Sequence, residues 1–119
     1  MADTEQITVE DKEGVAVVRF TSNKILDDII VQKFGEELLQ LIEQGSSKKI
    51  VLDFDGVEFL SSAALGHLIK IDKRAKANDA KMVLCNIRPS IYEVFAITRL
   101  DTVFTMKPAL DDAIAEIGG

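Results

Sequence analysis

The chain has 119 residues, of which 47% are hydrophobic and 29% are charged, a balance typical of ordinary globular proteins. Its net charge of −6 argues against general binding to nucleic acid or to an anionic membrane, because both require clustered Lys and Arg side chains. We therefore expect one domain, residues 1–119, whose partners include neither nucleic acid nor a membrane.

Three further features of the sequence predict a soluble, cytoplasmic protein. The single cysteine, Cys85, has no second thiol in the chain with which to form a disulfide, and this suits a reducing compartment. Residues 1–11 are polar and acidic, unlike a signal peptide. No apolar run approaches the roughly 20 residues that a membrane-spanning helix needs.

The first part of the chain predicts a β-hairpin followed by an amphipathic helix. Two short strand-like runs flank a Glu-Gly turn. Apolar residues then recur at helical spacing behind an acidic cap. The expected elements are a strand at residues 6–9, a turn at Glu13-Gly14, a strand at residues 15–20 and a helix from Asp27 or Asp28 to about Glu43.

The central segment, residues 48–71, predicts a buried strand, an acidic turn and a second helix. The strand is an apolar run rich in β-branched side chains, and a turn with a glycine ends it. After this turn, Val57 and Phe59 are expected to point back toward the core. Either Ser61 or Ser62 can cap the helix with its hydroxyl. The helix has one apolar stripe, formed by Ala64, Leu65, Leu68, Ile71 and Ala75.

Helical spacing places Ser62 on the face opposite this stripe, together with Gly66, Lys70 and Lys73. Ser62 is therefore expected to be accessible, beside a glycine that lets another backbone approach. A phosphate on Ser62 would lie at a helix N-terminus, where free N–H groups favour an anion, and would add about −1.5 to −2 charges. Spacing alone leaves two interpretations open, a phosphorylation switch and a helix cap.

The remainder of the chain alternates between strand and helix. A buried strand is followed by a helix that begins near a proline, then by a short strand and a terminal helix. This alternation after an opening hairpin predicts an α/β fold, with a mixed sheet and about four helices. The expected elements are strand 81–87, helix 90–97 after Pro89, strand 100–105 and a helix from Pro108 to Ile117. In helix 90–97, Ile91, Val94 and Phe95 are expected to point inward.

The sequence offers little material for catalysis. His67 is the single histidine and Cys85 the single thiol, so one chain cannot build a zinc cluster or a Cys–His pair. His67 is expected on the exposed helix face with Arg74, and Cys85 in the core. We therefore expect no catalytic residue, no metal site, no cofactor and no enzymatic activity.

One alternative is a receiver domain like those of bacterial response regulators, suggested by Asp53 near a strand end and by Lys107-Pro108. Receivers accept phosphate on an aspartate beside an acidic pair that holds Mg²⁺ after the first strand. Here Thr21-Ser22 follows that strand, so a metal would be poorly held. Asp53 is instead expected to hydrogen-bond the following turn or to poise the serine loop.

Residues 53–66, DFDGVEFLSSAALG, closely resemble the signature of the STAS domain, the sulphate-transporter and anti-sigma-factor-antagonist family. The regulatory members of that family are phosphorylated on the serine that matches Ser62. Many members have Asp where this chain has Ser61, which makes Ser61 a second choice for the phosphoacceptor, and many have Gly where it has Ala64. The resemblance implies the STAS fold over nearly the whole chain.

The same resemblance implies a non-catalytic binding module that acts as an anti-sigma factor antagonist. Its partner would be an anti-sigma factor with serine kinase activity, phosphorylation at Ser62 would release that partner, and a serine phosphatase would restore binding. The alternative is a constitutive scaffold or adaptor subunit in a sensory or transporter complex. Oligomeric state stays open. The expected partner-binding residues are Leu26, Asp27, Ser61, Ser62, Ala63, Gly66 and Lys70.

Overall fold

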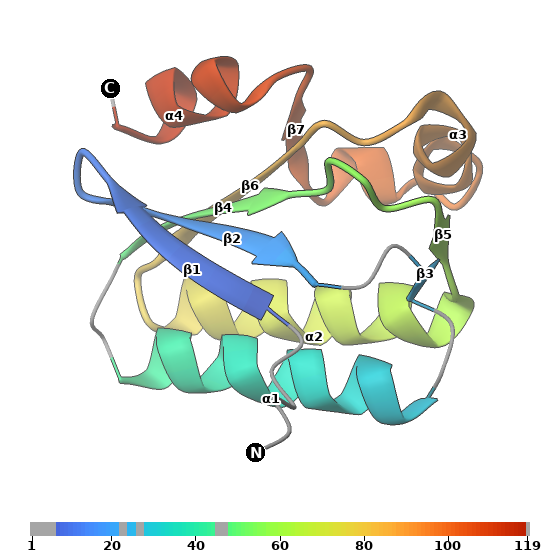
Figure 1. The fold of residues 1–119 in the computed structure, drawn as a ribbon, viewed down its shortest axis with the longest axis horizontal. Helices are drawn as coiled ribbons and strands as arrows, with labels where there is room; N and C mark the ends of the chain where they lie inside the picture. Colours follow the sequence, from blue (N-terminus) through green and yellow to red (C-terminus); the bar gives the residue numbers. More distant parts are fainter. Residues whose placement is uncertain (1–6, 22–23, 26–27, 45–47, 119) are drawn as a thin grey trace.

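The computed structural model describes residues 7–21, 24–25, 28–44 and 48–118, which form a mixed five-stranded sheet with helices on both faces (Figure 1). The strand order is β1-β2-β4-β6-β7, in which only the β1–β2 hairpin is antiparallel. The expected hairpin and strand–helix alternation are therefore confirmed. The strands are β1 (Ile7–Lys12), β2 (Val15–Phe20), β4 (Lys49–Asp53), β6 (Lys81–Cys85) and β7 (Thr105–Lys107).

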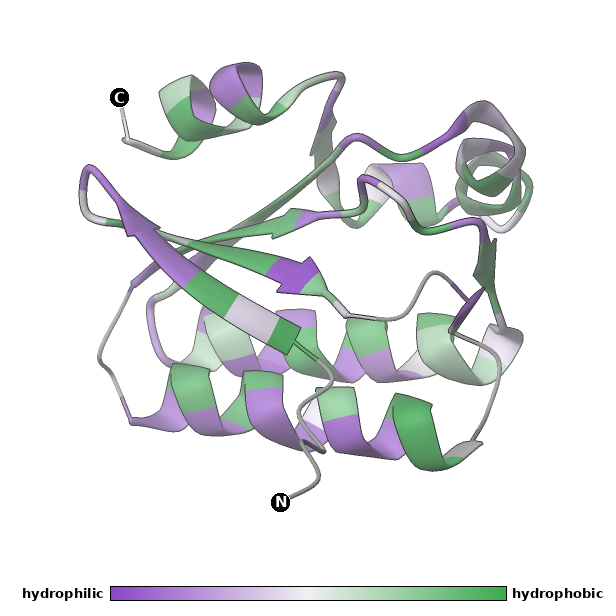
Figure 2. Ribbon diagram, in the orientation of Figure 1, coloured by the Kyte–Doolittle hydropathy of each residue, from purple (hydrophilic) through white to green (hydrophobic). Residues whose placement is uncertain are grey.

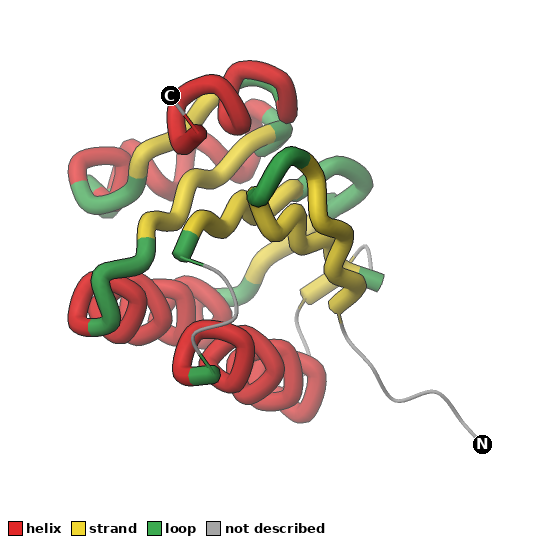
Figure 3. Tube along the Cα trace, turned by 90° about the vertical axis from the view of Figure 1, so that its left-hand side faces the viewer, coloured by secondary structure: helices red, strands yellow, loops and turns green. Residues whose placement is uncertain are grey.

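Two long helices, α1 (Asp28–Glu43) and α2 (Ser62–Ala77), lie side by side on one face of the sheet (Figure 1, Figure 3). The short α4 (Leu110–Gly118) lies on the other face. After β6 the chain forms α3 (Pro89–Ile97), at the end of the molecule where α2 begins. The described ranges thus hold four α-helices, and none of them is long and apolar enough to cross a bilayer.

Two apolar layers hold the elements together. The larger lies between the sheet and the helix pair, where Phe34 and Leu68 pack with Leu52, all fully buried. The smaller lies between the sheet and α4, where Val51 packs with Ala113. Successive residues of a strand point to opposite faces, so a strand that is buried on both faces is apolar throughout. Figure 2 shows this run of hydrophobic residues in the middle of β4 and β6.

Some element bounds differ from the sequence prediction, since β1 extends to Lys12, β6 ends at Cys85 and α4 begins only at Leu110. Two larger differences concern the strands. A second, two-stranded parallel sheet joins β3 (Lys24–Ile25) to β5 (Phe59–Leu60). Strands of two residues are too short to show a hydrophobic period, so the sequence pattern does not reveal them. The last strand is Thr105–Lys107 rather than 100–105, because Leu100–Thr102 winds into a 3₁₀ helix first.

Two expected core residues point outward. Phe59 is 50% exposed, because it belongs to β5 and not to the main sheet, whereas Val57 is buried as expected. Val94 of α3 is also exposed, at 39%, so that Ile91 and Phe95 alone form the buried side of that helix. The prediction that Phe59 and Val94 lie in the core was therefore wrong.

Candidate functional site

The two adjacent serines at the start of α2 have different surroundings. Ser61 is the N-cap, with extended backbone angles, and its hydroxyl accepts a hydrogen bond of 3.1 Å from the Ala64 N–H. Ser62 is the first helical residue and is exposed. A cap hydroxyl satisfies one of the free N–H groups of the first turn, so Ser61 has a structural task. Ser62 presents its hydroxyl to the surroundings.

The exposed face of α2 carries small side chains near Ser62 and basic side chains further along the helix. Gly66 and Lys70 are exposed, as the helical spacing predicts, and Ala63 is exposed too, while the apolar stripe on the opposite face is buried. The first turn of α2 contains no acidic residue. Small side chains let another backbone approach closely, and a helix N-terminus without a nearby carboxylate favours an added anion.

The miniature sheet of β3 and β5 connects this helix start to the segment that follows β2. Ile25 pairs with Leu60, which directly precedes the Ser61 cap. The Lys24 ammonium lies 5.7 Å from the ring centroid of Phe59, at the distance of a cation–π contact. The expected binding residues Leu26 and Asp27 come next in sequence, and they lie outside the described residues.

A buried carboxylate ties together the carboxyl ends of three neighbouring strands at this end of the sheet. Asp53, at the end of β4, has a side chain that is only 4% exposed. Its Oδ1 accepts hydrogen bonds of 2.9 Å from the Asp55 N–H and from Asn86 Nδ2. Its Oδ2 accepts one of 3.3 Å from Arg19 Nε, at the end of β2. The expected bond between Asp53 and the following turn is confirmed.

Arg19 and Asn86 were not among the residues singled out from the sequence. Arg19 also pairs with Glu10 at 2.8 Å, and that hydrogen bond is the main reason why the pKa of Arg19 is raised. Asn86 has a positive φ of 56°, a conformation that Asn tolerates better than most residues. The sequence does place a polar residue at the end of each of these three apolar strands. It does not show that the three strands are neighbours, so this network could not be predicted from it. The network also occupies both oxygens of Asp53, the candidate acceptor in a receiver.

Three exposed apolar residues belong to elements at the end of the molecule where α2 begins (Figure 1). They are Phe59 of β5, three positions before Ser62, and Tyr92 and the 80% exposed Ile97 of α3. Exposed apolar side chains that lie together often mark interaction sites, particularly when polar groups surround them. Among the large exposed hydrophobic residues, Phe59 is therefore the one nearest in sequence to Ser62, and a partner protein could cover it.

The described residues contain no group of three or more His, Cys, Asp and Glu side chains that could hold a metal ion. Cys85 is buried as expected, and burial, followed by the nearby Asp53 carboxylate, raises the pKa of its thiol to about 12. A thiol that stays protonated is a poor nucleophile. His67 is only half-exposed, because its imidazole packs against Gly35 of α1, whereas Arg74 is exposed as expected.

The sequence profile of the STAS domain matches residues 6–113. The anti-sigma F factor antagonist of Paenibacillus polymyxa is 23% identical to this chain over 109 residues, which cover 92% of this chain and 89% of that protein.

Solved structures have the same fold. An anti-sigma-factor antagonist (STAS) domain protein from Planctomyces limnophilus superposes with a TM-score of 0.83 at 25% identity, over 95% of this chain and 98% of that one. The anti-sigma factor antagonist SpoIIAA in its unphosphorylated form gives a TM-score of 0.73 at 22% identity, over 95% and 98% of the two chains. The phosphorylated Bacillus SpoIIAA gives 0.70 at 20% identity, over 93% and 98%.

Proposed function

Because the chain belongs to the STAS domain family, we propose that it is an anti-sigma factor antagonist whose partner binding is switched off by phosphorylation of Ser62. Residues 1–119 then form one STAS domain that is the substrate of a kinase and is not itself an enzyme. The partner is an anti-sigma factor with serine kinase activity, and a serine phosphatase reverses the modification. A partner that controls a sigma factor works where RNA polymerase works, which places this protein in the cytoplasm.

The observation that carries this proposal is that one of the two adjacent serines caps α2 while the other is exposed. A kinase must reach the hydroxyl that it modifies, and Ser62 is exposed on the first turn of α2. The Ser61 hydroxyl is engaged in the cap bond to Ala64, so its modification would remove a helix cap. This difference favours Ser62 as the phosphoacceptor over the second choice, Ser61.

The unmodified domain would bind through the small face of α2 and its surroundings. Ser62, Ala63 and Gly66 let the partner approach closely, and Phe59 supplies an apolar anchor beside them. Leu26 and Asp27 complete this surface in our proposal, because β3 ends one residue before them and pairs with β5.

A phosphate on Ser62 would change this surface without unfolding the helix. It would add about −1.5 to −2 charges at a helix N-terminus, where the N–H groups and the helix dipole stabilise an anion. No acidic residue of the first turn opposes it. The modified domain therefore keeps its fold, while a partner packed on the small face would have to bury the new charge or dissociate.

The test uses the protein as bait in a lysate of the source organism, followed by addition of Mg-ATP to the washed complex. We expect capture of a kinase-like anti-sigma factor, an acid-stable phosphate on Ser62 found by mass spectrometry, and release of the partner. The Ser62→Ala bait should capture the same protein and keep it after ATP is added.

Two outcomes would contradict the proposal. An acid-labile phosphate on Asp53 would favour the receiver alternative. Stable capture of a multi-protein complex that ignores ATP and carries no phosphate on Ser62 would favour the scaffold, with Ser62 left as an ordinary first residue of a helix.

Phe59→Ala is expected to weaken partner binding about tenfold, because a half-exposed aromatic ring beside a binding face can be buried by the partner. The free energy of unfolding should change by less than about 0.5 kcal/mol, since the ring lies outside the core. Val9→Ala is the matched control, because Val9 is also 50% exposed but lies on the edge strand β1. Titration calorimetry and urea unfolding measure the two effects, and equal binding by both variants would exclude Phe59 from the interface.

A further inference from the structure

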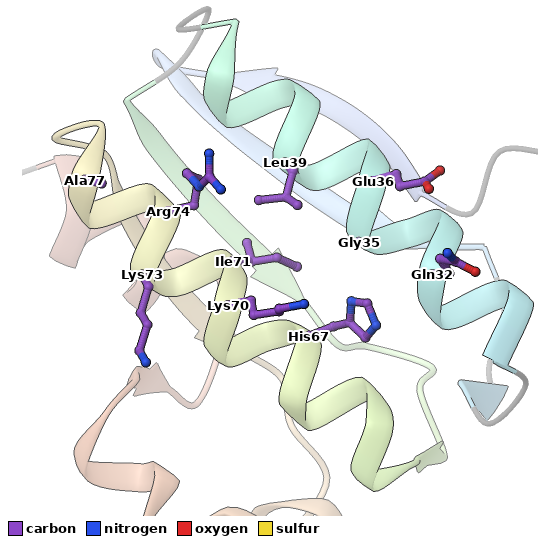
Figure 4. Close-up of a pocket in the computed structure, with 10 residues that line it drawn as sticks. All are labelled: Gln32, Gly35, Glu36, Leu39, His67, Lys70, Ile71, Lys73, Arg74 and Ala77. Carbon is purple, nitrogen blue, oxygen red and sulfur yellow. The ribbon is translucent and has the colours of Figure 1, made fainter.

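An open groove runs between α1 and α2 on the side of the helix pair that faces away from the sheet (Figure 4). Its volume is about 470 Å³. Leu39 of α1 and the buried Ile71 of α2 form its apolar floor. Gln32 and Glu36 line the α1 side, while His67, Lys70 and Arg74 line the α2 side.

At one end of this groove the His67 side chain packs against α1. Gly35 has no side chain, and the His67 imidazole lies over it, so that a Cβ on Gly35 would come within 3.0 Å of His67 Nδ1. Glycine inside a helix is less favourable than alanine. The close packing of His67 on Gly35 gives this glycine a structural reason, and it leaves the groove open from His67 toward the C-terminal end of α2 (Figure 4).

The α2 side of the groove is basic in a chain whose net charge is −6. The single acidic residue of α2, Asp72, is buried and pairs with Lys76 at 2.9 Å. Arg74 pairs with Glu43 of α1. Lys70 and Lys73 are exposed and form no ion pair within the part of the chain that the structure describes. Figure 4 shows Lys70 reaching into the gap beside His67, Lys73 pointing away from it, and the Glu36 carboxylate directed away from α2.

We propose that this groove docks an acidic segment of the partner protein, with an apolar side chain on Leu39 and Ile71 and carboxylates beside Lys70. The identity of the partner rests on the proposed function. A cation without an ion pair, beside an apolar floor, is complementary to a segment that carries both carboxylates and an apolar residue. The groove begins at His67, directly after Gly66, so one partner can cover the Ser62 face and the groove together.

In this arrangement a phosphate on Ser62 would repel the carboxylates of the docked acidic segment. Lys70 is eight positions beyond Ser62, or about 12 Å along the helix axis. That separation is close to the Debye length of about 8–10 Å at physiological salt, so a phosphate acts strongly on carboxylates near Gly66 and more weakly on those beside Lys70. Release would then begin at the serine face, while the groove retains a residual, salt-sensitive affinity.

The experiment compares Lys70→Glu, Lys73→Glu and Lys12→Glu, each bound to the purified partner over a range of salt concentrations. Lys70→Glu is expected to weaken binding about tenfold or more at low salt, mostly through slower association, and to reduce the salt dependence. Lys73→Glu should have a smaller effect, because Lys73 points out of the groove. Lys12→Glu on β1 makes the same charge change away from the groove and should leave the affinity unchanged.

The variants separate failure of the groove from failure of the switch. If Ser62→Asp abolishes binding and Lys70→Glu acts no more strongly than Lys12→Glu, the groove proposal is wrong and the switch stands. If Lys70→Glu weakens binding and Ser62→Asp does not, the groove stands without the switch.

A second experiment does not need the partner. A short helical peptide with leucines on one face and glutamates along its flank is titrated into the full chain and followed by amide NMR shifts. Shifts that map to the groove, in wild type and in Ser62→Asp, support the proposal. Scattered shifts, or equal binding of the same peptide with lysines in place of glutamates, would overturn it.

Discussion

Ser62→Asp is expected to weaken binding to the anti-sigma partner by at least about 100-fold, which corresponds to about 2.8 kcal/mol. The change places a charge on the small, exposed face of α2 that a partner would cover closely. A charge buried in an interface without a partner loses its hydration and gains nothing in return. Titration calorimetry with the purified partner measures this loss.

The fold of Ser62→Asp should be intact, because a carboxylate in the first turn of a helix interacts favourably with the helix dipole. Urea unfolding should therefore give a free energy of unfolding equal to or slightly above that of the wild type. Ser62→Asn, with nearly the same shape and no charge, is the matched control and should retain most of the affinity. If the Asp and Asn variants bind the partner with equal affinity, negative charge at position 62 is not what switches binding off.

Ser61→Ala is the control for the neighbouring hydroxyl. It removes the cap bond to the Ala64 N–H and should lower the free energy of unfolding by about 1 kcal/mol. Its effect on partner binding should be small when the protein is fully folded. The two serines would then be distinguished, because the change at Ser61 lowers stability and the change at Ser62 weakens partner binding.

The sequence is a good guide to the elements that carry a local period. The apolar stripe of α2 places Ser62, Gly66 and Lys70 on its exposed face, and the structure confirms that placement. The predicted bounds of β2 also match the structure. In each case the information lies within one short stretch of chain, where the spacing of apolar residues decides which side is buried.

Features that depend on the pairing of distant segments were not predicted. The outward position of Phe59 follows from the β3–β5 pairing, which joins residues 24–25 to residues 59–60. The position of His67 depends on Gly35, in another helix, because only the missing side chain leaves room for the imidazole. The groove beside them results from this packing, and helical spacing within α2 alone gave no sign of it.

The largest effect on stability is expected from Asp53→Ala, which should lower the free energy of unfolding by about 2–4 kcal/mol. The change removes the acceptor for the Asp55 N–H, the Asn86 amide and the Arg19 guanidinium. Donors that stay buried without a partner each cost roughly 1–3 kcal/mol. Because a domain of this kind has only about 5–15 kcal/mol of stability in total, urea unfolding should detect the loss clearly.

Arg19→Ala provides the comparison, because it removes one member of the same network from its exposed side. The Arg19 side chain is 39% exposed and its other partner, Glu10, is 53% exposed, so this change should cost about 1 kcal/mol or less. Asp53→Asn should lie between the two variants, since its amide keeps one acceptor oxygen but brings a second donor toward Asn86 or Arg19. If Asp53→Ala costs no more than Arg19→Ala, the buried carboxylate does not hold the three strand ends together. If the expected order is found, the turn after β4, which leads through β5 to Ser62, depends on Asp53 for its stability. Weaker partner binding by folded Asp53→Ala protein would then show that the exposed face around Ser62 also depends on this carboxylate.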